Sequence, residues 1–200
     1  MAPRGDTKAR MIAAAEDLFR RRGYVATALT DVVEASGTPR GSIYFHFRGG
    51  KEELAVSVTE RVGALLEETV EEAAAGAASA GDIPRRLADT FAHNMTSSGY
   101  ELGCPLAPIS LETAPASEVL RDACAAAFQR WSNRLAEHYT RHGVPQRRAR
   151  VLAVLTISSL EGALILARVE ESITPLTEAA EELAAVVAGA ADESVRPDDA

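Results

Sequence analysis

Two short helix-forming segments joined by a glycine constrain the fold of this chain most strongly. They lie in residues 23–54, GYVATALTDVVEASGTPRGSIYFHFRGGKEEL. Thr30 is a typical helix N-cap and Gly37 a typical helix end. Thr38 and Pro39 then predict a second helix start, because Thr caps helices and Pro is tolerated at their first position. Two helices joined by so short a turn predict a helix-turn-helix, whose second helix enters the major groove of DNA.

Polar residues at the start of the second predicted helix are candidates for DNA contacts. Arg40 could donate two hydrogen bonds to a guanine edge, Ser42 could bond a base or phosphate, and Gly41 would allow close approach. Lys51 would begin the next helix, where its charge and the backbone amides could hold one phosphate. The predicted DNA-binding residues are Thr27, Thr30, Thr38, Pro39, Arg40, Gly41, Ser42, Tyr44, His46 and Lys51.

The same segment resembles a known family. The resemblance rests on Gly23-Tyr24, Thr27, Thr30-Asp31-Val32, Gly37, Arg40-Gly41-Ser42-Ile43-Tyr44, His46-Phe47 and Lys51-Glu52-Glu53-Leu54. This pattern is similar to the N-terminal signature of the TetR family of bacterial repressors and covers the first quarter of the chain. It implies a small DNA-binding head on a helical body that pairs with a second copy.

Motifs farther along the chain resemble one subgroup of that family, the lincomycin-resistance and flavonoid-responsive repressors. These motifs are Gly103-Cys104-Pro105-Leu106, Leu120-Arg121, Ala127-Phe128, Trp131 and Leu160-Glu161-Gly162-Ala163. The subgroup resemblance implies an effector that is a planar hydrophobic compound, such as a drug or a flavonoid.

Length and composition favour a helical protein with a large core. The chain has 200 residues, 46% of them hydrophobic, and can bury about 70% of the surface of its unfolded state. No stretch alternates apolar and polar residues as a strand does. We therefore expect an all-α fold of about nine helices. It would comprise a three-helix helix-turn-helix DNA-binding domain (1–50), a helical effector-binding and dimerisation domain (51–190) and a disordered acidic tail (191–200).

The N-terminal sequence lacks the pattern of a signal peptide, a basic region followed by an uninterrupted apolar run. We therefore expect a cytoplasmic protein. In that compartment Cys104 and Cys124 would be reduced core thiols more often than a disulfide or a redox switch.

Charge is distributed unevenly along the chain. Residues 1–51 carry nine Lys or Arg and five Asp or Glu, whereas the remainder carries twelve and twenty-four, within a net charge of −8. Phosphates would therefore be attracted only to the N-terminal part. An ordinary solvated acidic surface explains most of the remaining negative charge equally well.

Residues 151–167, VLAVLTISSLEGALILA, are apolar on all sides except for Glu161 and a few hydroxyls. Such a helix must be covered on more than one face, by lipid or by protein. The stretch is shorter than the ~20 residues of a membrane span, and a charge past its middle would cost ~2.5 kcal/mol or more. We therefore expect a core contact on one face and a second copy on the other. Together with the last helix, and as the family resemblance also implies, the dimer interface would contain Leu155, Ser158, Ser159, Gly162, Ala163, Leu183, Val186 and Val187.

Aromatic and apolar residues of the body are candidates for a small-molecule site, although each could equally be an ordinary core residue. Trp131 and Met95 are favoured, because a large flat ring and an adaptable thioether suit a planar apolar ligand. Glu161 could be a polar anchor for the ligand or a hydrogen-bonding group of the core. The full candidate set is Phe91, Met95, Leu102, Cys104, Leu106, Leu111, Phe128, Trp131, Tyr139 and Glu161.

Motifs for catalysis or metal binding are missing from the sequence. There is no GxSxG motif, no glycine-rich phosphate loop and no acid pair in a defined context. His138 and His142 stand four residues apart, but no third zinc ligand is suitably spaced. We therefore expect no enzymatic activity, no metal and no cofactor.

Two classes of function remain. The first is a dimeric transcriptional repressor that binds a palindromic operator and is released by a small hydrophobic effector. The alternative is a helical small-molecule-binding dimer with a vestigial DNA-binding head. Arg40, Tyr44 and Lys51 favour the first, because a vestigial head would not need cations and a phenol at contact positions. An activator, or a repressor without an effector, stays open.

Overall fold

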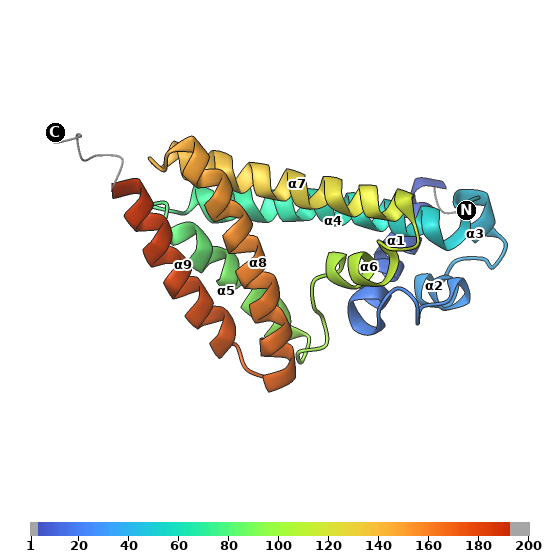
Figure 1. Cartoon of the computed structure of the whole chain (residues 1–200). Helices are drawn as coiled ribbons and strands as arrows, with labels where there is room; N and C mark the ends of the chain where they lie inside the picture. Colours follow the sequence, from blue (N-terminus) through green and yellow to red (C-terminus); the bar gives the residue numbers. More distant parts are fainter. Residues whose placement is uncertain (1–3, 193–200) are drawn as a thin grey trace. The chain divides into compact units, whose positions relative to one another are not determined.

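The computed structural model describes residues 4–192, and every regular element in that range is a helix (Figure 1). The all-α prediction is confirmed, as is the number of helices within the described range. The helices are α1 (Arg4–Arg22), α2 (Leu29–Ser36), α3 (Ser42–His46), α4 (Gly50–Ala75), α5 (Asp82–Ser97), α6 (Leu106–Thr113), α7 (Glu118–Arg141), α8 (Gln146–Glu170) and α9 (Thr174–Asp192). Of the expected tail, residues 191 and 192 belong to α9, and residues 193–200 lie outside the described range.

The helices form two compact units. Unit 1 contains the described residues up to Ala64 together with Cys104–Ala127. Unit 2 contains Leu65–Gly103 together with the described residues from Phe128 onward. The expected domain boundary after residue 50 does not coincide with this division. The first part of α4, all of α6 and the first part of α7 belong with the N-terminal helices, so α4 and α7 each contribute to both units.

Unit 1 is built around α1, which packs against α2 and α6. Its core includes Phe19 of α1, Phe47 after α3 and Leu54 of α4, all fully buried. Three large apolar side chains from successive elements therefore fix α3 and the start of α4 on the rest of the unit.

The first helix of the predicted helix-turn-helix begins at Leu29, and Thr30 is not its cap. Ala28 occupies the N-cap position, and the Asp31 carboxylate accepts a hydrogen bond from the Ala28 amide at 3.0 Å. An acid in the first turn thus satisfies a free amide in place of the expected hydroxyl. Gly37 ends the helix as predicted, with a left-handed φ of 60°.

The second helix of the motif, α3, begins at Ser42 rather than at Pro39. The Ser42 hydroxyl donates to the Pro39 carbonyl at 2.5 Å, and Thr38, Pro39 and Arg40 form the turn before the helix. The connection between α2 and α3 is therefore longer than predicted, and Arg40 lies on that turn.

Unit 2 consists of α5, α8 and α9, which pack on one another, and of the C-terminal parts of α4 and α7. Leu87 of α5, Leu152 of α8 and Val187 of α9 are fully buried. On the surface of the unit, the Arg85 guanidinium of α5 binds the Glu181 carboxylate of α9, with Nη2 and Oε2 2.8 Å apart. The pair stabilises the packing of α5 on α9 only modestly, because both side chains are exposed.

Helix α8 has the length and composition of a membrane-crossing helix, a test that the core helix of a soluble protein also passes. In this structure 44% of its most apolar window is buried within the chain. Protein thus covers one face of α8, as the sequence predicts.

Candidate nucleic-acid interface

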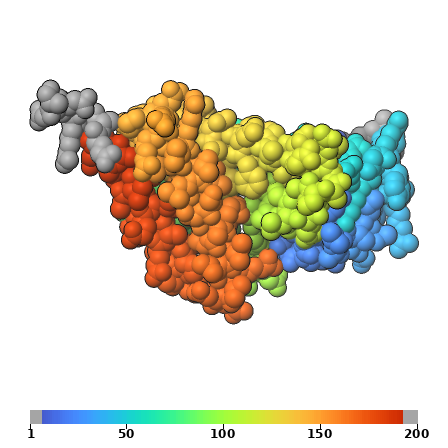
Figure 2. All heavy atoms as spheres, viewed as in Figure 1, coloured from blue at the N-terminus to red at the C-terminus, as the bar shows by residue number. Residues whose placement is uncertain are grey.

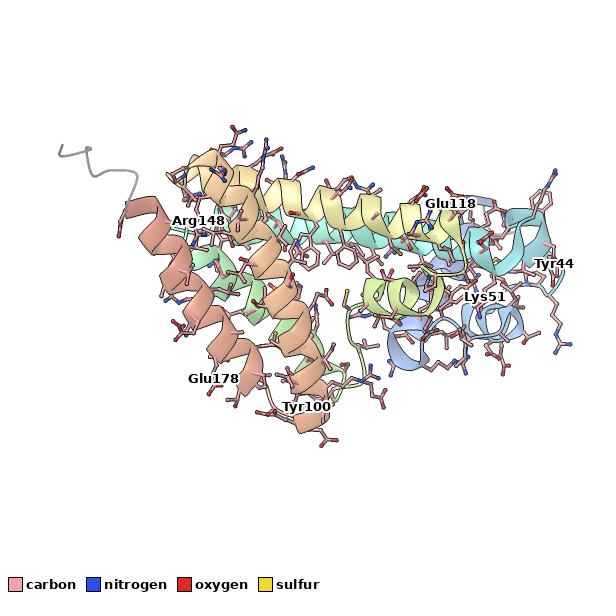
Figure 3. The ribbon with its side chains drawn as sticks, viewed as in Figure 1. Tyr44, Lys51, Tyr100, Glu118, Arg148 and Glu178 are labelled. Atoms are coloured by element: carbon pink, nitrogen blue, oxygen red, sulfur yellow. The ribbon has the colours of Figure 1, made fainter. Side chains whose placement is uncertain are left out.

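A groove of about 610 Å³ lies between α2 and α3 in unit 1. Thr30 and Glu34 line it from α2, Arg40 from the turn and Tyr44 from α3. The Tyr44 ring is 64% exposed and points to solvent (Figure 3). A hydroxyl, a guanidinium and a phenol on one concave surface can donate hydrogen bonds to base edges and phosphates.

Arg40 is the cation of this surface that the fold does not use. Within the described residues its side chain forms no ion pair or hydrogen bond, and it is exposed. By contrast, Arg22 binds Asp31 at 2.6 Å and Arg10 donates to the Ser36 carbonyl at 2.5 Å. Arg48, between α3 and α4, is a second exposed cation of unit 1 and was not among the predicted contacts.

Thr27 and Thr38 have hydrogen-bond partners inside the fold. Thr27 is buried and donates its hydroxyl to the Gly23 carbonyl at 2.8 Å. The Thr38 hydroxyl is buried 2.7 Å from that of Ser36, and Thr38 also lines the groove. A DNA contact of either residue stays a prediction. Thr30, Pro39 and Gly41 are exposed, and Ser42 is half-buried.

His46 lies half-buried between aromatic rings, 5.1 Å from the Phe45 ring and 6.5 Å from the Phe47 ring. These distances describe packing against neighbouring rings, and a phosphate contact of His46 stays a prediction.

Lys51 contacts its own chain at the start of α4 (Figure 3). Its ammonium donates to the Val25 carbonyl at 3.2 Å and lies 4.2 Å from the centroid of the Tyr24 ring. Partial burial lowers the pKa of Lys51, an effect that the negative charges of Glu112 and Asp31 oppose. Lys51 is therefore a positive charge held in place by the loop before α2.

Glu112 of α6 is a residue of the head that sequence analysis missed. Its carboxylate accepts a hydrogen bond from the Val25 amide at 2.5 Å and lies against Gly23, where a Cβ atom would collide with it. The Ser117 hydroxyl, after α6, donates to Glu52 of α4 at 2.5 Å. Helix α6 and the turn that follows it thus hold both the loop before α2 and the start of α4. A single exposed acid has no sequence signal for such a contact.

Trp131 of unit 2 is the centre of an aromatic cluster. Its ring lies edge to face with Phe91, with centroids 6.2 Å apart, and stacks on Phe128 at 6.3 Å. The indole Nε1 is buried and has no hydrogen-bond partner within the described residues. Met95, also in unit 2, is fully buried. Because buried N–H groups normally have partners, Trp131 is an unusual core residue.

The other residues predicted for the small-molecule site lie outside the Trp131 cluster or belong to the core. Leu111 is 77% exposed, so it lies on the surface and not in a pocket. The Tyr139 hydroxyl is 2.9 Å from that of Thr156 in a fully buried pair, and burial raises the pKa of Tyr139. We therefore assign Tyr139 to the core of unit 2. Leu106 is buried in unit 1, and Leu102, Cys104 and Glu161 are half-buried.

The outer face of α8 is exposed along the helix (Figure 2). Leu155, Ser158 and Gly162 lie on this face, and Val186 is exposed on α9. The face also carries residues that the sequence analysis did not select, namely Val151, Val154, Ile165, Leu166 and Val169. Ser159 is half-buried. Ala163, Leu183 and Val187 are buried in the core of the chain, and their contact with a second copy stays a prediction.

Cys104 and Cys124 are not joined in a disulfide. His138 lies 2.9 Å from a Glu71 carboxylate oxygen, and over residues 4–192 no three His, Cys, Asp or Glu side chains are grouped to hold a metal ion.

Comparison with known proteins matches the N-terminal and the C-terminal part of the chain to two family models. Residues 11–58 match the family model of bacterial regulatory proteins of the tetR family, and residues 82–182 match that of the C-terminal domain of LmrA/YxaF-like transcriptional regulators. An uncharacterized HTH-type transcriptional regulator of Mycobacterium tuberculosis strain H37Rv is 38% identical over 84% of this chain and 87% of its own length.

Two further proteins extend the comparison. The HTH-type transcriptional repressor DhaR of Mycobacterium sp. strain GP1 is 28% identical, over 80% of this chain and 81% of its own. The crystal structure of a TetR transcriptional regulator from Chloroflexus aurantiacus is 30% identical, with a TM-score of 0.76 over 92% of this chain and 94% of that one. These relatives are regulators of transcription, in agreement with the expectation that the chain is not an enzyme. The chain belongs to the TetR family of helix-turn-helix transcriptional regulators, with a C-terminal domain of the LmrA/YxaF-like type.

Proposed function

We propose that the protein is a cytoplasmic, dimeric repressor that binds a palindromic operator and is released from it by a small hydrophobic effector. The observation that carries this proposal is the combination of Arg40 and Tyr44, exposed on one groove of unit 1, whereas Arg22 and Arg10 are held by contacts within the fold. A vestigial head would not need such a surface. The repressor DhaR, a relative by sequence, makes repression the expected direction of regulation.

A dimer follows from the outer face of α8. Val151, Val154, Leu155 and Ile165 are each more than two fifths exposed, on one face of a single helix. A contiguous apolar face of this kind is characteristic of an interface. A two-fold axis between two chains would place two heads on two half-sites of opposite orientation, which is why we propose a palindromic operator.

An effector site follows from the Trp131 cluster. Three aromatic rings and the Met95 thioether offer flat, polarisable contacts, and the Trp131 N–H lacks an acceptor within the described residues. We therefore propose that the effector is planar and hydrophobic and carries at least one hydrogen-bond acceptor.

Release requires a connection between effector and head. Helix α7 carries Phe128 and Trp131, and its first turn follows Ser117, which binds Glu52 at the start of α4. Coupling of 1 to 3 kcal/mol along this helix would change operator affinity by about 5- to 150-fold. Loss of the Glu112 and Ser117 hydrogen bonds on effector binding is the step that we propose for release.

Selection of bound fragments from the genome of the source organism, followed by footprinting, tests the operator proposal. We expect enriched fragments with an inverted repeat, both halves of which are protected. Saturation at two chains per site is expected as well. Enrichment of no sequence at all would support the vestigial head, and a single protected half-site would overturn the dimer on a palindrome.

A further inference from the structure

The turn between α7 and α8 concentrates positive charge in an acidic part of the chain. Residues 138–160 form the longest run of the sequence without Asp or Glu, and they carry Arg141, Arg147, Arg148 and Arg150. The chain as a whole has a net charge of −8. These four side chains define the arginine cluster of unit 2, with Arg148 labelled in Figure 3.

Two other arginines of unit 2 are paired with acids. Arg85 binds Glu181 at 2.8 Å, and Arg130 binds Glu67 at 3.0 Å. In contrast, no ion pair or hydrogen bond holds any side chain of the arginine cluster within the part of the chain that the structure describes, and all four residues are exposed. Guanidinium groups without ion-pair partners repel one another where they lie close together, and an anion between them relieves that repulsion.

A groove of about 500 Å³ lies beside this turn, between the end of α7 and the beginning of α8. Arg141 lines it from α7 and Arg150 from α8, so two cations reach it from the two helices. Asn133, Thr140 and Gln146 add amide and hydroxyl groups. The volume is that of a small-molecule site, and the lining is polar rather than apolar.

One acid, Glu137, also lines the groove. Arg134 of the same helix donates to its carboxylate at 2.9 Å and also binds Glu71, so it offsets the negative charge of Glu137 in part. The first turn of α8 adds to the positive potential, because Pro145 at its N-cap position provides no side-chain cap for the free amides. The groove is therefore an electropositive site on both of its sides.

We propose that this groove binds a small anion with two adjacent phosphate groups, such as the diphosphate of a nucleotide or of another phosphorylated metabolite. Each guanidinium can hold two oxygens of one phosphate, and guanidiniums from two helices suit two linked phosphates. The polar lining would bond the remaining oxygens. This ligand is chemically distinct from a planar hydrophobic effector, so the protein would respond to two kinds of small molecule.

Calorimetric titration of the full chain with inorganic pyrophosphate tests the site. We expect saturable binding of one anion per chain in low salt. The R141Q/R150Q variant, which loses both cations of the groove, should bind at least about tenfold more weakly, since a hydrogen bond to a charged group contributes about 1.5 to 3 kcal/mol. R150K keeps the charge but removes the planar guanidinium. Its affinity for pyrophosphate should lie between those of the parent protein and the R141Q/R150Q variant.

The matched control is R147Q/R148Q, which removes the same charge from the same cluster but from residues that do not line the groove. We expect its affinity for pyrophosphate to change less than threefold. Equal loss in the two double variants would show diffuse attraction and overturn the proposal, as would the absence of saturable binding to the parent protein. Displacement of pyrophosphate by a non-operator DNA duplex would also overturn it, in favour of a nucleic-acid surface.

Discussion

The carboxylate of Glu112 accepts a hydrogen bond from the backbone amide of Val25 at 2.5 Å. The first residue lies in α6, and the second lies in the loop that precedes the first helix of the DNA-binding motif. The same loop binds Lys51 through the Val25 carbonyl at 3.2 Å. One peptide segment thus joins an acid of α6 to a cation of α4, within a single compact unit.

Replacing Glu112 by Ala should weaken operator binding. The loop before α2 loses the Glu112 carboxylate as acceptor, and ordering the loop on DNA then costs more conformational entropy. We expect a three- to tenfold loss of affinity, the equivalent of about 1 kcal/mol for an exposed charged hydrogen bond. Leu111→Ala, one residue earlier and 77% exposed, is the control in the same fluorescence-anisotropy assay. Equal loss in the two variants would remove the special role of Glu112.

Arg40→Ala and Lys51→Ala should have different effects on DNA binding, the first on base preference and the second on overall affinity. Arg40 is exposed at the groove, so its loss should reduce the preference for one base pair in each half-site, by about 1 to 3 kcal/mol. Lys51 lies beside a loop and an aromatic ring, and its loss should weaken binding to all sequences and lower the salt slope by about 0.9. Titrations against a set of single-base operator variants at several salt concentrations separate the two patterns. Identical patterns would contradict the proposed docking.

The single tryptophan of the chain makes the effector proposal measurable. A planar compound that releases DNA should also quench Trp131 fluorescence. Trp131→Phe removes the unpartnered N–H and should weaken that compound about three- to tenfold, as judged by DNA release. Tyr139→Phe removes a hydroxyl that already has Thr156 as partner, and it should leave effector affinity unchanged. Equal effects of the two substitutions would move the site away from Trp131.

Gly162→Glu should produce monomers. A Cβ at Gly162 meets nothing within 4 Å in the single chain, so the substitution is tolerated sterically by one copy. In a symmetric interface it would bring two like charges together out of water, at a cost of several kcal/mol. Light scattering measures the mass of the particle, with Val119→Glu, at an exposed site of α7, as control. An intact dimer of the Gly162 variant would place the interface elsewhere.

Asp82 makes stability sensitive to acid. Its carboxylate accepts hydrogen bonds from the Ser79 hydroxyl, the Ser79 amide and the Ala78 amide, which together with Arg85 lower its pKa. Because the folded-state pKa lies below that of the unfolded chain, this contribution to stability is complete above the unfolded value and disappears as pH falls through the folded one. The stability difference between the parent and Asp82→Asn should therefore shrink between about pH 5 and pH 2 in urea titrations. A constant difference would contradict the assignment.

Local rules predicted the elements better than the contacts of their side chains. Gly37 ends α2 as expected, and α4 begins at Gly50, one residue before the expected start at Lys51, because helix-start and helix-end signals act over a few neighbouring residues. The positions of Thr27 and Thr38 in the motif predict DNA contacts. Within the chain their hydroxyls bond to Gly23 and Ser36, and only the folded loop shows these contacts.

Tertiary contacts account for the remaining differences. Leu111 and Ala163 are both apolar residues on helices, yet one is exposed and the other buried. Helical spacing alone does not say which face of α6 or α8 meets its neighbours. The contact between Glu112 and Val25 joins residues 87 positions apart and has no local signature.

The central claim is that the head binds a specific DNA sequence. A gel-shift titration of the full chain against DNA from around its own gene, at two salt concentrations and with excess competitor DNA, tests it most directly. The account predicts saturable binding that survives the competitor, with dissociation constants of about 10⁻⁸ M or below at physiological salt. The contradicting result has two parts. Binding would be weak at both salt concentrations and removed by the competitor, and genome-wide selection would then find no preferred fragment.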